Sequence, residues 1–392
     1  MKNVLMSAAA IAALATAAQA DGHGPVKVGI ILGFTGPIES LTPGMADGAE
    51  LALSEASASG LFLDGKTLEP VRADSTCTDA AAASAAAERL ITSDGVVAIM
   101  GADCSGVTTA VANNVAVPNG VVMISPSATS PALSDIDDNG LFFRTAPSDA
   151  RQGAVLADVL TERGIKSVAV TYTNNDYGKG FAEAFAAAYS GSVELSAAHA
   201  DGKGDYSAEV GALAAAGGDA LVVLGYVDQG GRGIIQAALD TGAFEMFALG
   251  DGMFGESLLA AIGPDLDGAT IGTVPGSEGQ GAGMFIDAMS GAGLDGDGPY
   301  RAESYDAAAL IALAMQAGGE ATKEAVAANV LAVANAPGEP IFPGELAKAL
   351  QILADGGEVD YVGATGVELI GPGEAAGSYR EYEVQDGAFQ TI

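Results

Sequence analysis

Short, continuous apolar runs alternate with amphipathic stretches along most of the chain. In the first part, apolar runs predict strands at 26–32, 68–73, 96–100 and 121–124, and helical spacing predicts helices at 45–58, at 80–91 and from 107 onward. Strands that are apolar on both faces and alternate with helices are typical of a parallel sheet covered on both sides. The first part therefore has the pattern of an α/β lobe.

The rhythm breaks at residues 141–149, where an apolar run ends in a polar, proline-containing segment, and a second series follows. Its expected strands are 167–172, 193–198, 220–224, 246–249 and 270–274, and its expected helices are 150–163, 180–189, 206–216, 233–241 and 256–262. Three further helices are expected at 304–316, 323–334 and 343–353, and short strands at 366–370, 379–384 and 388–392. A chain of 392 residues exceeds what one core usually organises, so we expect two lobes.

The first twenty residues have the pattern of an export signal. Lys2 gives a positive start, residues 4–18 are apolar, and Ala18-Gln19-Ala20 forms a small-residue exit before Asp21. The apolar run is too short to span a bilayer. We therefore predict that residues 1–20 are a signal peptide and that the remaining chain is exported.

Acidic residues greatly outnumber basic ones. The 16 Lys and Arg residues face 50 Asp and Glu residues, for a net charge of −34. Nucleic acid and anionic membrane surfaces repel such a chain, so neither is expected as a partner. The acidity suits solubility in a salty medium and gives no information about the fold.

Cys77 and Cys104 are the only cysteines. In an exported chain a single pair favours a disulfide. Two free buried thiols and a metal-binding pair remain alternatives, although no histidine lies near either cysteine in the sequence.

Two consecutive loops follow strands of the first series. The first places Ser105 at or near the N-cap of a helix, whose unpaired amides attract carboxylates. The second, at 125–131, is rich in hydroxyl groups and contains Thr129. Each loop alone could be an ordinary capped turn. Because neighbouring parallel strands carry both loops to one edge of the sheet, where ligands of α/β sheets bind, the pair favours a carboxylate site.

The second series has polar loops at corresponding places. Tyr177, Tyr226 and Asp251 each follow an expected strand. Individually, each could cap a turn or pack on its own loop. Together they would place a carboxylate and two phenols opposite Ser105 and Thr129, an arrangement complementary to an α-amino acid.

Enzymatic motifs are lacking in the sequence. It contains no nucleophile elbow, zinc-ligand cluster or lysine-containing phosphate loop, and its only histidines are His23 and His199. No catalytic residue, metal or cofactor is therefore expected.

Taken together, the leader and several motifs resemble the periplasmic leucine/isoleucine/valine-binding proteins, which are type I substrate-binding proteins of ABC importers. The motifs are Gly33-Phe34-Thr35-Gly36-Pro37, Asp103-Cys104-Ser105, Ser125-Pro126-Ser127-Ala128-Thr129, Arg144-Thr145, Asp149, Asp176-Tyr177-Gly178 and Ser304-Tyr305-Asp306-Ala307. The resemblance covers nearly the whole exported chain. It implies an α/β, type I periplasmic-binding-protein fold, with two Rossmann-like lobes, a three-strand hinge and a ligand cleft between the lobes.

The resemblance also implies where the lobes begin and end. Lobe 1 would contain residues 21–145 and 275–362, and lobe 2 residues 146–274 and 363–392. The chain would cross between lobes near Thr145, Pro275 and Val362.

Residue by residue, the resemblance implies a ligand site and a disulfide. The ligand carboxylate would be held by Ser105, Ser127, Ala128 and Thr129, the ammonium group by Asp251, and the ligand would be covered by Tyr177, Tyr226 and Tyr300. The family disulfide matches Cys77–Cys104. Two departures stand out: Asp251 replaces the glutamate of better-known members, and Leu41 replaces a usual tyrosine. Both leave more room, so strict leucine specificity is not implied.

By resemblance, the protein would be a periplasmic monomer that captures an amino acid-like ligand, either a branched-chain or hydrophobic amino acid or a related carboxylate. It would close its lobes on the ligand and deliver it to a permease in the inner membrane. One alternative is a ligand sensor of the same fold that docks a receptor. Another is a binder of a small carboxylate without an amino group.

Overall fold

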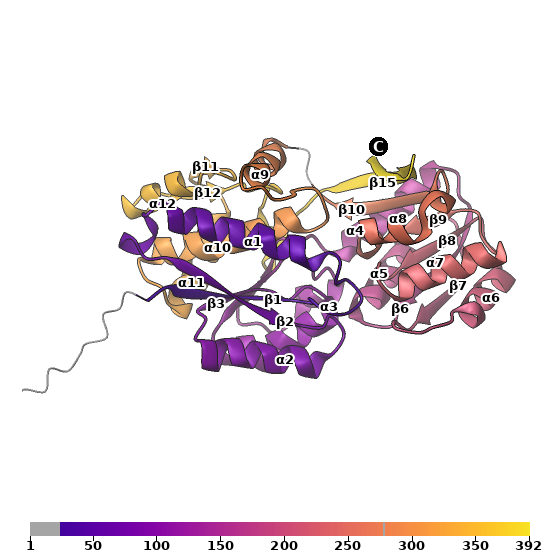
Figure 1. The fold of residues 1–392 in the computed structure, drawn as a ribbon, viewed down its shortest axis with the longest axis horizontal. Coiled ribbons are helices and arrows are strands. Elements are labelled where there is room, and N and C mark those ends of the chain that lie inside the picture. The colour runs from indigo at the N-terminus through magenta and orange to yellow at the C-terminus, as the bar shows by residue number, and fades with distance from the viewer. Residues whose placement is uncertain (1–23, 277–278) are drawn as a thin grey trace, which may run out of the picture.

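The computed structural model describes residues 24–276 and 279–392, so the predicted signal peptide and His23 lie outside the described residues. Two α/β lobes lie side by side along the long axis of the molecule, each built on a seven-stranded sheet (Figure 1). Both sheets are mainly parallel and carry helices. The predicted α/β class with two Rossmann-like lobes is confirmed.

The first sheet combines strands from both ends of the chain. In spatial order its strands are β13 (Leu369–Ile370), β14 (Glu374–Ala375), β5 (Phe142–Arg144), β4 (Val122–Ser125), β3 (Ala98–Gly101), β1 (Val26–Leu32) and β2 (Leu68–Asp74). Its helices are α1 (Thr42–Ala58), α2 (Ala80–Arg89), α3 (Ser105–Val111), α9 (Gln280–Gly291), α10 (Arg301–Gly318), α11 (Lys323–Ala334) and α12 (Leu346–Ala354). A small parallel pair, β11 (Glu339–Ile341) and β12 (Val359–Tyr361), lies beside α12.

The second sheet is parallel except for the two strands nearest the C-terminus of the chain. In spatial order it contains β16 (Ala388–Thr391), β15 (Tyr379–Gln385), β10 (Thr270–Pro275), β9 (Phe247–Leu249), β8 (Ala220–Leu224), β6 (Ser167–Thr173) and β7 (Ser192–His199). Its helices are α4 (Asp149–Glu162), α5 (Asp176–Ala188), α6 (Ser207–Ala216), α7 (Gly230–Thr241) and α8 (Glu256–Ile262). Short helical turns at Leu90–Asp94 and Ala112–Ala116 extend α2 and α3, and another at Asp251–Met253 follows β9.

Sheet membership locates the crossings between lobes. The chain leaves the first sheet after Arg144 and leaves the strand β10 of the second sheet after Pro275, close to two of the expected positions. The third crossing differs from the expectation near Val362. Because β13 and β14 pair within the first sheet, the chain crosses only between Ala375 and Tyr379. Two-residue strands have no periodicity that a sequence pattern can reveal.

Helix α10 forms the centre of the first lobe. It packs against α1 and α11 and over β3 and β4, and its side chains from Glu303 to Gln316 are buried on all sides. A helix that is buried all round lies inside a core, which explains the mainly apolar sequence of the helix predicted at 304–316. The start of α10 places Tyr300 and Glu303 between the lobes.

Some elements escaped sequence analysis. No element was predicted at α9, β11, β12 or β14. Helix α9 contains three glycines, Gly281, Gly283 and Gly291, which lower helix propensity. The strands have only two or three residues, and their partners fix them in place.

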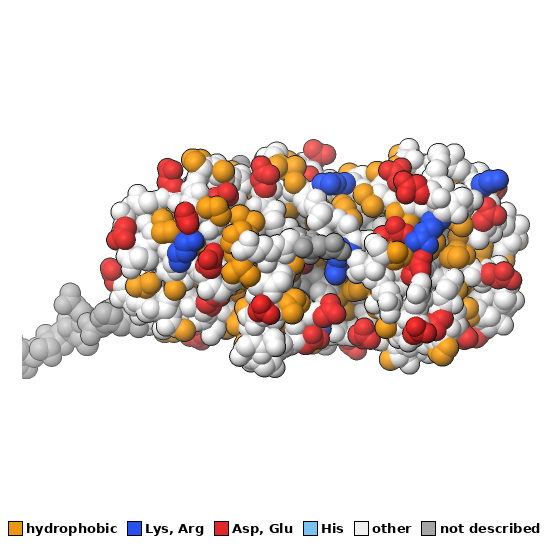
Figure 2. All heavy atoms as spheres, turned by 90° about the horizontal axis from the view of Figure 1, so that it is seen from above, with side chains coloured by type: hydrophobic (Ala, Val, Ile, Leu, Met, Phe, Trp, Pro, Cys, Tyr) orange, Lys and Arg blue, Asp and Glu red, His pale blue; other side chains and the backbone are white. Residues whose placement is uncertain are grey.

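On the face seen in Figure 2, acidic side chains are scattered and basic ones are few and lie apart from one another. Within residues 24–276 and 279–392, no helix is both long and apolar enough to cross a membrane.

The predicted disulfide between Cys77 and Cys104 is present. It links the turn after β2 to the start of α3. Thr76 and Cys77 both adopt a positive backbone angle φ, which is uncommon for residues other than glycine. Asp74 accepts the Thr76 N–H and Ser75 accepts the Cys77 N–H, so side chains and the disulfide together hold this turn.

Removing the disulfide should lower stability. The bond joins residues 27 positions apart, and freeing a loop of that size costs about 3–4 kcal/mol by the chain-entropy estimate. A Cys77→Ala/Cys104→Ala double variant should lose about that much free energy of unfolding in urea titration. Thiol titration of the denatured, unreduced parent should detect nothing, and two reactive thiols per chain would contradict the pairing.

Candidate functional site

A narrow cavity of about 20 Å³ lies between the two lobes, at the carboxyl ends of their parallel strands. Most of the predicted ligand-binding residues line it: Ser105, Ser127, Tyr177, Tyr226, Asp251 and Tyr300. Ala128 and Thr129 do not line it and are fully buried. The volume is roughly what one water molecule needs. The closed cleft thus brings together residues from both lobes.

The apolar side of this cavity contains Leu41, which the resemblance had placed beside the ligand, and two residues that sequence reasoning missed, Ile38 and Met45. Ile38, Leu41 and Met45, from the start of α1 and the segment before it, line it. Leu41 also reaches the second lobe, because a Cβ added at Gly255 would lie 2.9 Å from its Cδ2 atom. Apolar residues at a helix start look like ordinary core residues in a sequence, so only their position shows that they face a cleft.

Hydrogen bonds join the two loops of the first lobe. Ser105 is the first residue of α3, with Cys104 as the N-cap, and its hydroxyl accepts the Ser130 N–H at 3.1 Å. Ser127 donates its hydroxyl to the Asp103 carbonyl at 3.1 Å. The expected proximity of the two loops is therefore present, with Ser105 one position after the cap.

Asp103 also lines the cavity, but both oxygens of its carboxylate are occupied. One accepts the Gly33 N–H at 2.6 Å and the other the Ser75 hydroxyl at 2.7 Å. Burial raises the pKa of Asp103, and these hydrogen bonds oppose the rise. Asp103 therefore serves to hold the ends of β1 and β2.

Asp251 accepts hydrogen bonds from two tyrosines. The Tyr177 hydroxyl donates to it at 3.0 Å from the same lobe, and the Tyr300 hydroxyl at 2.5 Å from the other. Tyr177 also stacks on Tyr226, with ring centroids 5.2 Å apart. Burial raises the pKa of Asp251, and the Tyr300 and Tyr177 hydrogen bonds oppose the rise.

Tyr300 reaches the cleft through an unusual backbone. Its φ of +61° lies in the left-handed region, which is uncommon for a tyrosine. The Tyr300 carbonyl accepts both the Ser304 N–H and the Ser304 hydroxyl, which fixes this residue at the start of α10. The helix start thereby determines where the Tyr300 ring lies.

Asp149 is a second buried carboxylate that sequence reasoning did not assign to the site. Its N–H donates to the Thr129 carbonyl at 2.8 Å. Among the described residues, neither carboxylate oxygen of Asp149 nor the Thr129 hydroxyl has a hydrogen bond of ordinary geometry. The pKa of Asp149 is raised well above its usual value, first by burial and then by the negative charge of Asp251. The Thr129 hydroxyl and the Arg144 charge oppose this rise.

Asp149 is thus a buried carboxylate whose pKa is raised by burial and by a second buried carboxylate, Asp251, in a region short of positive charge. Such a region favours a cation. The signal was available in the sequence, because Asp149 belongs to the motifs that carry the resemblance.

Contacts across the mouth of the cleft hold the lobes together. The Asp228 N–H donates to the Pro37 carbonyl at 3.0 Å, and the Asp228 carboxylate accepts the Ser40 N–H at 2.9 Å. Ser257, from the same lobe as Asp228, donates its hydroxyl to that carboxylate at 2.6 Å. Asp228 thus connects the segment before α1 to the second lobe.

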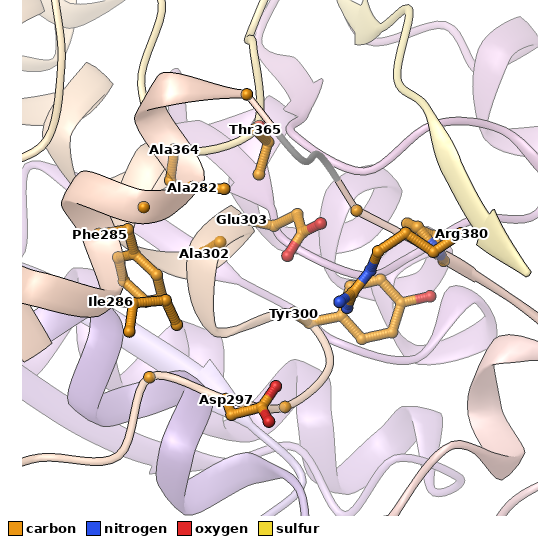
Figure 3. Close-up of a pocket in the computed structure, with 16 residues that line it drawn as sticks. Ala282, Phe285, Ile286, Asp297, Tyr300, Ala302, Glu303, Ala364, Thr365 and Arg380 are labelled. Carbon is orange, nitrogen blue, oxygen red and sulfur yellow. The ribbon is translucent and has the colours of Figure 1, made fainter. Parts of the chain in front are cut away.

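Tyr300 also lines a larger cavity, of about 320 Å³, beside the segments that cross between the lobes. Figure 3 shows Glu303 and Arg380 pointing toward each other in this cavity. Burial raises the pKa of Glu303 to about 8; Asp306 adds to the rise and Arg380 opposes it. Among the described residues, the buried Nε atom of Arg380 has no hydrogen-bond partner. Within the same residues, no group of three or more His, Cys, Asp or Glu side chains could hold a metal ion.

Comparisons with known proteins agree with the fold and extend it. A protein family described as "Periplasmic binding protein" matches residues 25–347. A leucine-, isoleucine-, valine-, threonine- and alanine-binding protein of Pseudomonas aeruginosa is 30% identical, with 82% of this chain and 86% of the relative covered. The chemotactic signal transduction system substrate-binding protein BasB of Halobacterium salinarum is 28% identical, with 94% and 89% covered. In structure, the branched-chain amino acid transporter substrate-binding protein LivJ of Streptococcus pneumoniae, solved with isoleucine, has a TM-score of 0.77 at 24% identity, covering 94% of this chain and 99% of LivJ.

Glu303 should make stability depend on pH. Its pKa is raised from 4.5 to about 8 in the folded protein, so the folded state keeps a proton that the unfolded state releases. This contribution is fully present below about pH 4.5 and is lost as pH rises toward 8. Because glutamine does not ionise, Glu303→Gln does not lose this contribution to stability as pH rises. The Tm of the variant relative to that of the parent should therefore increase by several degrees between pH 5 and pH 8.

Glu324→Gln is the matched control, because Glu324 lies in the first turn of α11 but is exposed. The control should follow the parent at every pH. Equal pH dependence for Glu303→Gln and the parent, measured by thermal unfolding, would contradict the assignment.

Proposed function

The chain belongs to the periplasmic binding protein family, among its leucine/isoleucine/valine-binding members, and on this premise we propose that it is the substrate-binding protein of an ABC importer for a small amino acid. The observation that carries the proposal is the pair of buried carboxylates, Asp149 and Asp251, near the hydroxyl-rich loops that contain Ser105 and Thr129. Such a site offers one end to an ammonium group and the other to a carboxylate. Delivery of the ligand to a membrane permease is part of the proposal.

The carboxylate end would be formed by Ser105, Ser127 and Thr129, with Ala128 contributing its backbone. The first two line the cavity, and the Thr129 hydroxyl is buried without a hydrogen bond of ordinary geometry among the described residues. Hydroxyl and amide donors without a cationic side chain suit one small carboxylate. Among the residues that the structure describes, no arginine or lysine lines this cavity.

The ammonium end would be formed by Asp251 and Asp149. A ligand cation in a closed cleft loses its water and needs carboxylate partners in exchange. Asp251 is already held by Tyr177 of its own lobe, so its position is fixed before a ligand arrives. Asp149 supplies the additional acceptor capacity that an ammonium group can use.

The ligand side chain would lie against Ile38, Leu41 and Met45, because these residues form the apolar part of the cavity lining. Burial of apolar surface favours an aliphatic side chain there. Tyr177, Tyr226 and Tyr300 would cover the ligand from the remaining sides.

Binding would require the lobes to move. A cavity of about 20 Å³ is too small for an amino acid, so the ligand enters while the lobes are apart and the liganded cleft is wider than this closed form. A ligand that contacts both lobes binds the closed state better and thereby shifts the equilibrium toward it. The three segments that cross between the lobes would act as the hinge.

A ligand sensor is a second candidate. The Halobacterium salinarum relative is named as part of a chemotactic signal transduction system, and it is similar over almost the whole chain. The same ligand site could serve either role. Genes for a permease and an ATPase beside this one would favour the importer. A third candidate, a binder of a carboxylate without an amino group, is disfavoured because it would leave Asp149 and Asp251 without a cation.

Asp251→Asn should weaken the binding of amino acids much more than the binding of carboxylates without an amino group. The change keeps the shape and removes the charge, and a hydrogen bond to a charged group contributes about 1.5–3 kcal/mol. By calorimetry, L-leucine should bind the variant roughly ten- to hundredfold more weakly than the parent. Its analogue without the amino group, 4-methylpentanoate, should be affected much less.

Asp240→Asn, on the exposed surface of α7, is the control and should bind leucine like the parent. If leucine binds Asp251→Asn as tightly as the parent, or if only 4-methylpentanoate binds the parent, the ammonium assignment is wrong.

Asp228→Ala should favour the open state. It removes the charged acceptor of the Ser40 N–H while leaving the cavity lining untouched. Because the contact is solvent-exposed, we expect a loss of about three- to tenfold in leucine affinity and a larger radius of gyration for the ligand-free protein in small-angle X-ray scattering. Asp240→Ala should change neither quantity. Unchanged affinity and an unchanged radius of gyration for Asp228→Ala would show that this contact does not control closure.

A further inference from the structure

Arg144 is a buried cation that lines neither cavity and yet holds the proposed carboxylate loop. It is the last residue of β5 and is 1% exposed. Its Nη1 atom donates to the Ala128 carbonyl at 3.0 Å and to the Ser130 carbonyl at 2.9 Å. These two carbonyls lie on either side of Thr129. Because the C=O and N–H of a trans peptide point in opposite directions, the Thr129 N–H points away from Arg144.

The other side of the guanidinium group is equally engaged. Nη2 donates to the Ser134 hydroxyl at 2.8 Å and forms an ion pair with Glu374. Ser134 itself donates to the Glu374 carboxylate at 2.5 Å. Glu374 lies in β14, next to Arg144 in parallel register. We refer to Arg144, Ser134 and Glu374 as the arginine clamp.

The arginine clamp lies where two crossing segments leave the first sheet. Thr145, the next residue after Arg144, donates its hydroxyl to the Glu303 carbonyl at 2.8 Å. Glu374 belongs to the last strand of this sheet before the chain crosses to β15. Movement of either segment would therefore act on the guanidinium group, and through it on the loop.

A purely structural arginine would only need to join β5 to β14. Two observations point beyond that. Both Nη1 hydrogen bonds go to the loop that contains Thr129, and the positive charge of Arg144 opposes the rise in the pKa of Asp149. The planar fork of arginine suits this task, because it holds several acceptors in a fixed geometry.

We propose that Arg144 is a positioning residue, which orients the 127–130 loop for the ligand carboxylate and couples this loop to the hinge through Glu374. The link to ligand affinity rests on the proposed function. The orientation of the loop does not rest on the proposed function, because the contacts that orient it all lie within the protein.

Arg144→Lys tests the proposal. Lysine keeps the positive charge but cannot span both loop carbonyls and Glu374. In the ligand-free protein, hydrogen exchange of peptides covering residues 122–134 should be faster than in the parent. Calorimetry should show about ten- to hundredfold weaker binding of L-leucine, because the charged hydrogen bonds that orient the loop are lost.

Thr129→Ala distinguishes positioning from general damage. If Arg144 acts through the loop, the losses in affinity should not add up. The double variant Arg144→Lys/Thr129→Ala should then bind leucine about as tightly as whichever single variant has the lower affinity. Two independent losses would instead multiply. Glu374→Gln keeps an acceptor and removes the charge, so it should show the same effects more mildly and carries the test if Arg144→Lys does not fold.

Arg163→Lys is the matched control. Arg163 forms ion pairs with Glu381 and Glu383 of β15, so it also attaches a strand near the end of the chain, but it contacts no ligand loop. It should leave leucine affinity and exchange of residues 122–134 unchanged. Unchanged loop exchange in Arg144→Lys and Glu374→Gln, or multiplicative losses with Thr129→Ala, would overturn the proposal. If the parent does not bind leucine, the proposed function fails for this ligand, while loop exchange still decides the role of Arg144.

Discussion

The hydrogen bond from the Tyr300 hydroxyl to Asp251 joins the two lobes inside the closed cleft. Asp251 follows β9 in the second sheet, and Tyr300 precedes α10 in the first lobe. A carboxylate buried between lobes needs donors from both sides, since its own lobe cannot surround it. The stacked pair of Tyr177 and Tyr226 and the left-handed backbone of Tyr300 are arranged around this buried charge. Closure of the cleft and the chemistry of the site therefore depend on the same contact.

Several buried acids have raised pKa values, and their hydrogen bonds separate structural roles from functional ones. Asp306 accepts from the Tyr361 hydroxyl and from the backbone and side chain of the loop at 364–365. Asp103 is satisfied in a similar way by Gly33 and Ser75. Asp149 has no such set of donors among the described residues. Asp306 and Asp103 therefore hold loops of the fold in place, whereas Asp149 keeps acceptor capacity for the ligand that we propose.

Helix α10 connects these features because its first turns face the interface between the lobes. Tyr300 precedes it, Glu303 points into the cavity beside the crossing segments, and Asp306 holds the loop that leads to β13. The spacing of three residues places Glu303 and Asp306 on one side of the helix. One buried helix thus supports the proposed ligand site, the segments that cross between the lobes and the end of the first sheet.

The local pattern of apolar residues was enough to predict two α/β series, most of their strands and the loops that follow them. This is possible because strand and helix periodicities are properties of neighbouring residues. The loops at the strand ends led to Ser105, Thr129, Tyr177, Tyr226 and Asp251, and the family resemblance added Ser127, Ala128 and Tyr300. Their assignment as ligand-binding residues remains a prediction.

Only the tertiary structure showed that Asp149 lies close to Asp251, that Arg144 holds the loop around Thr129, and that β13 and β14 belong to the first sheet. Such contacts join residues far apart in the chain. They depend on how the two lobes meet and on which strand a short segment finds as a partner, and no local pattern records either.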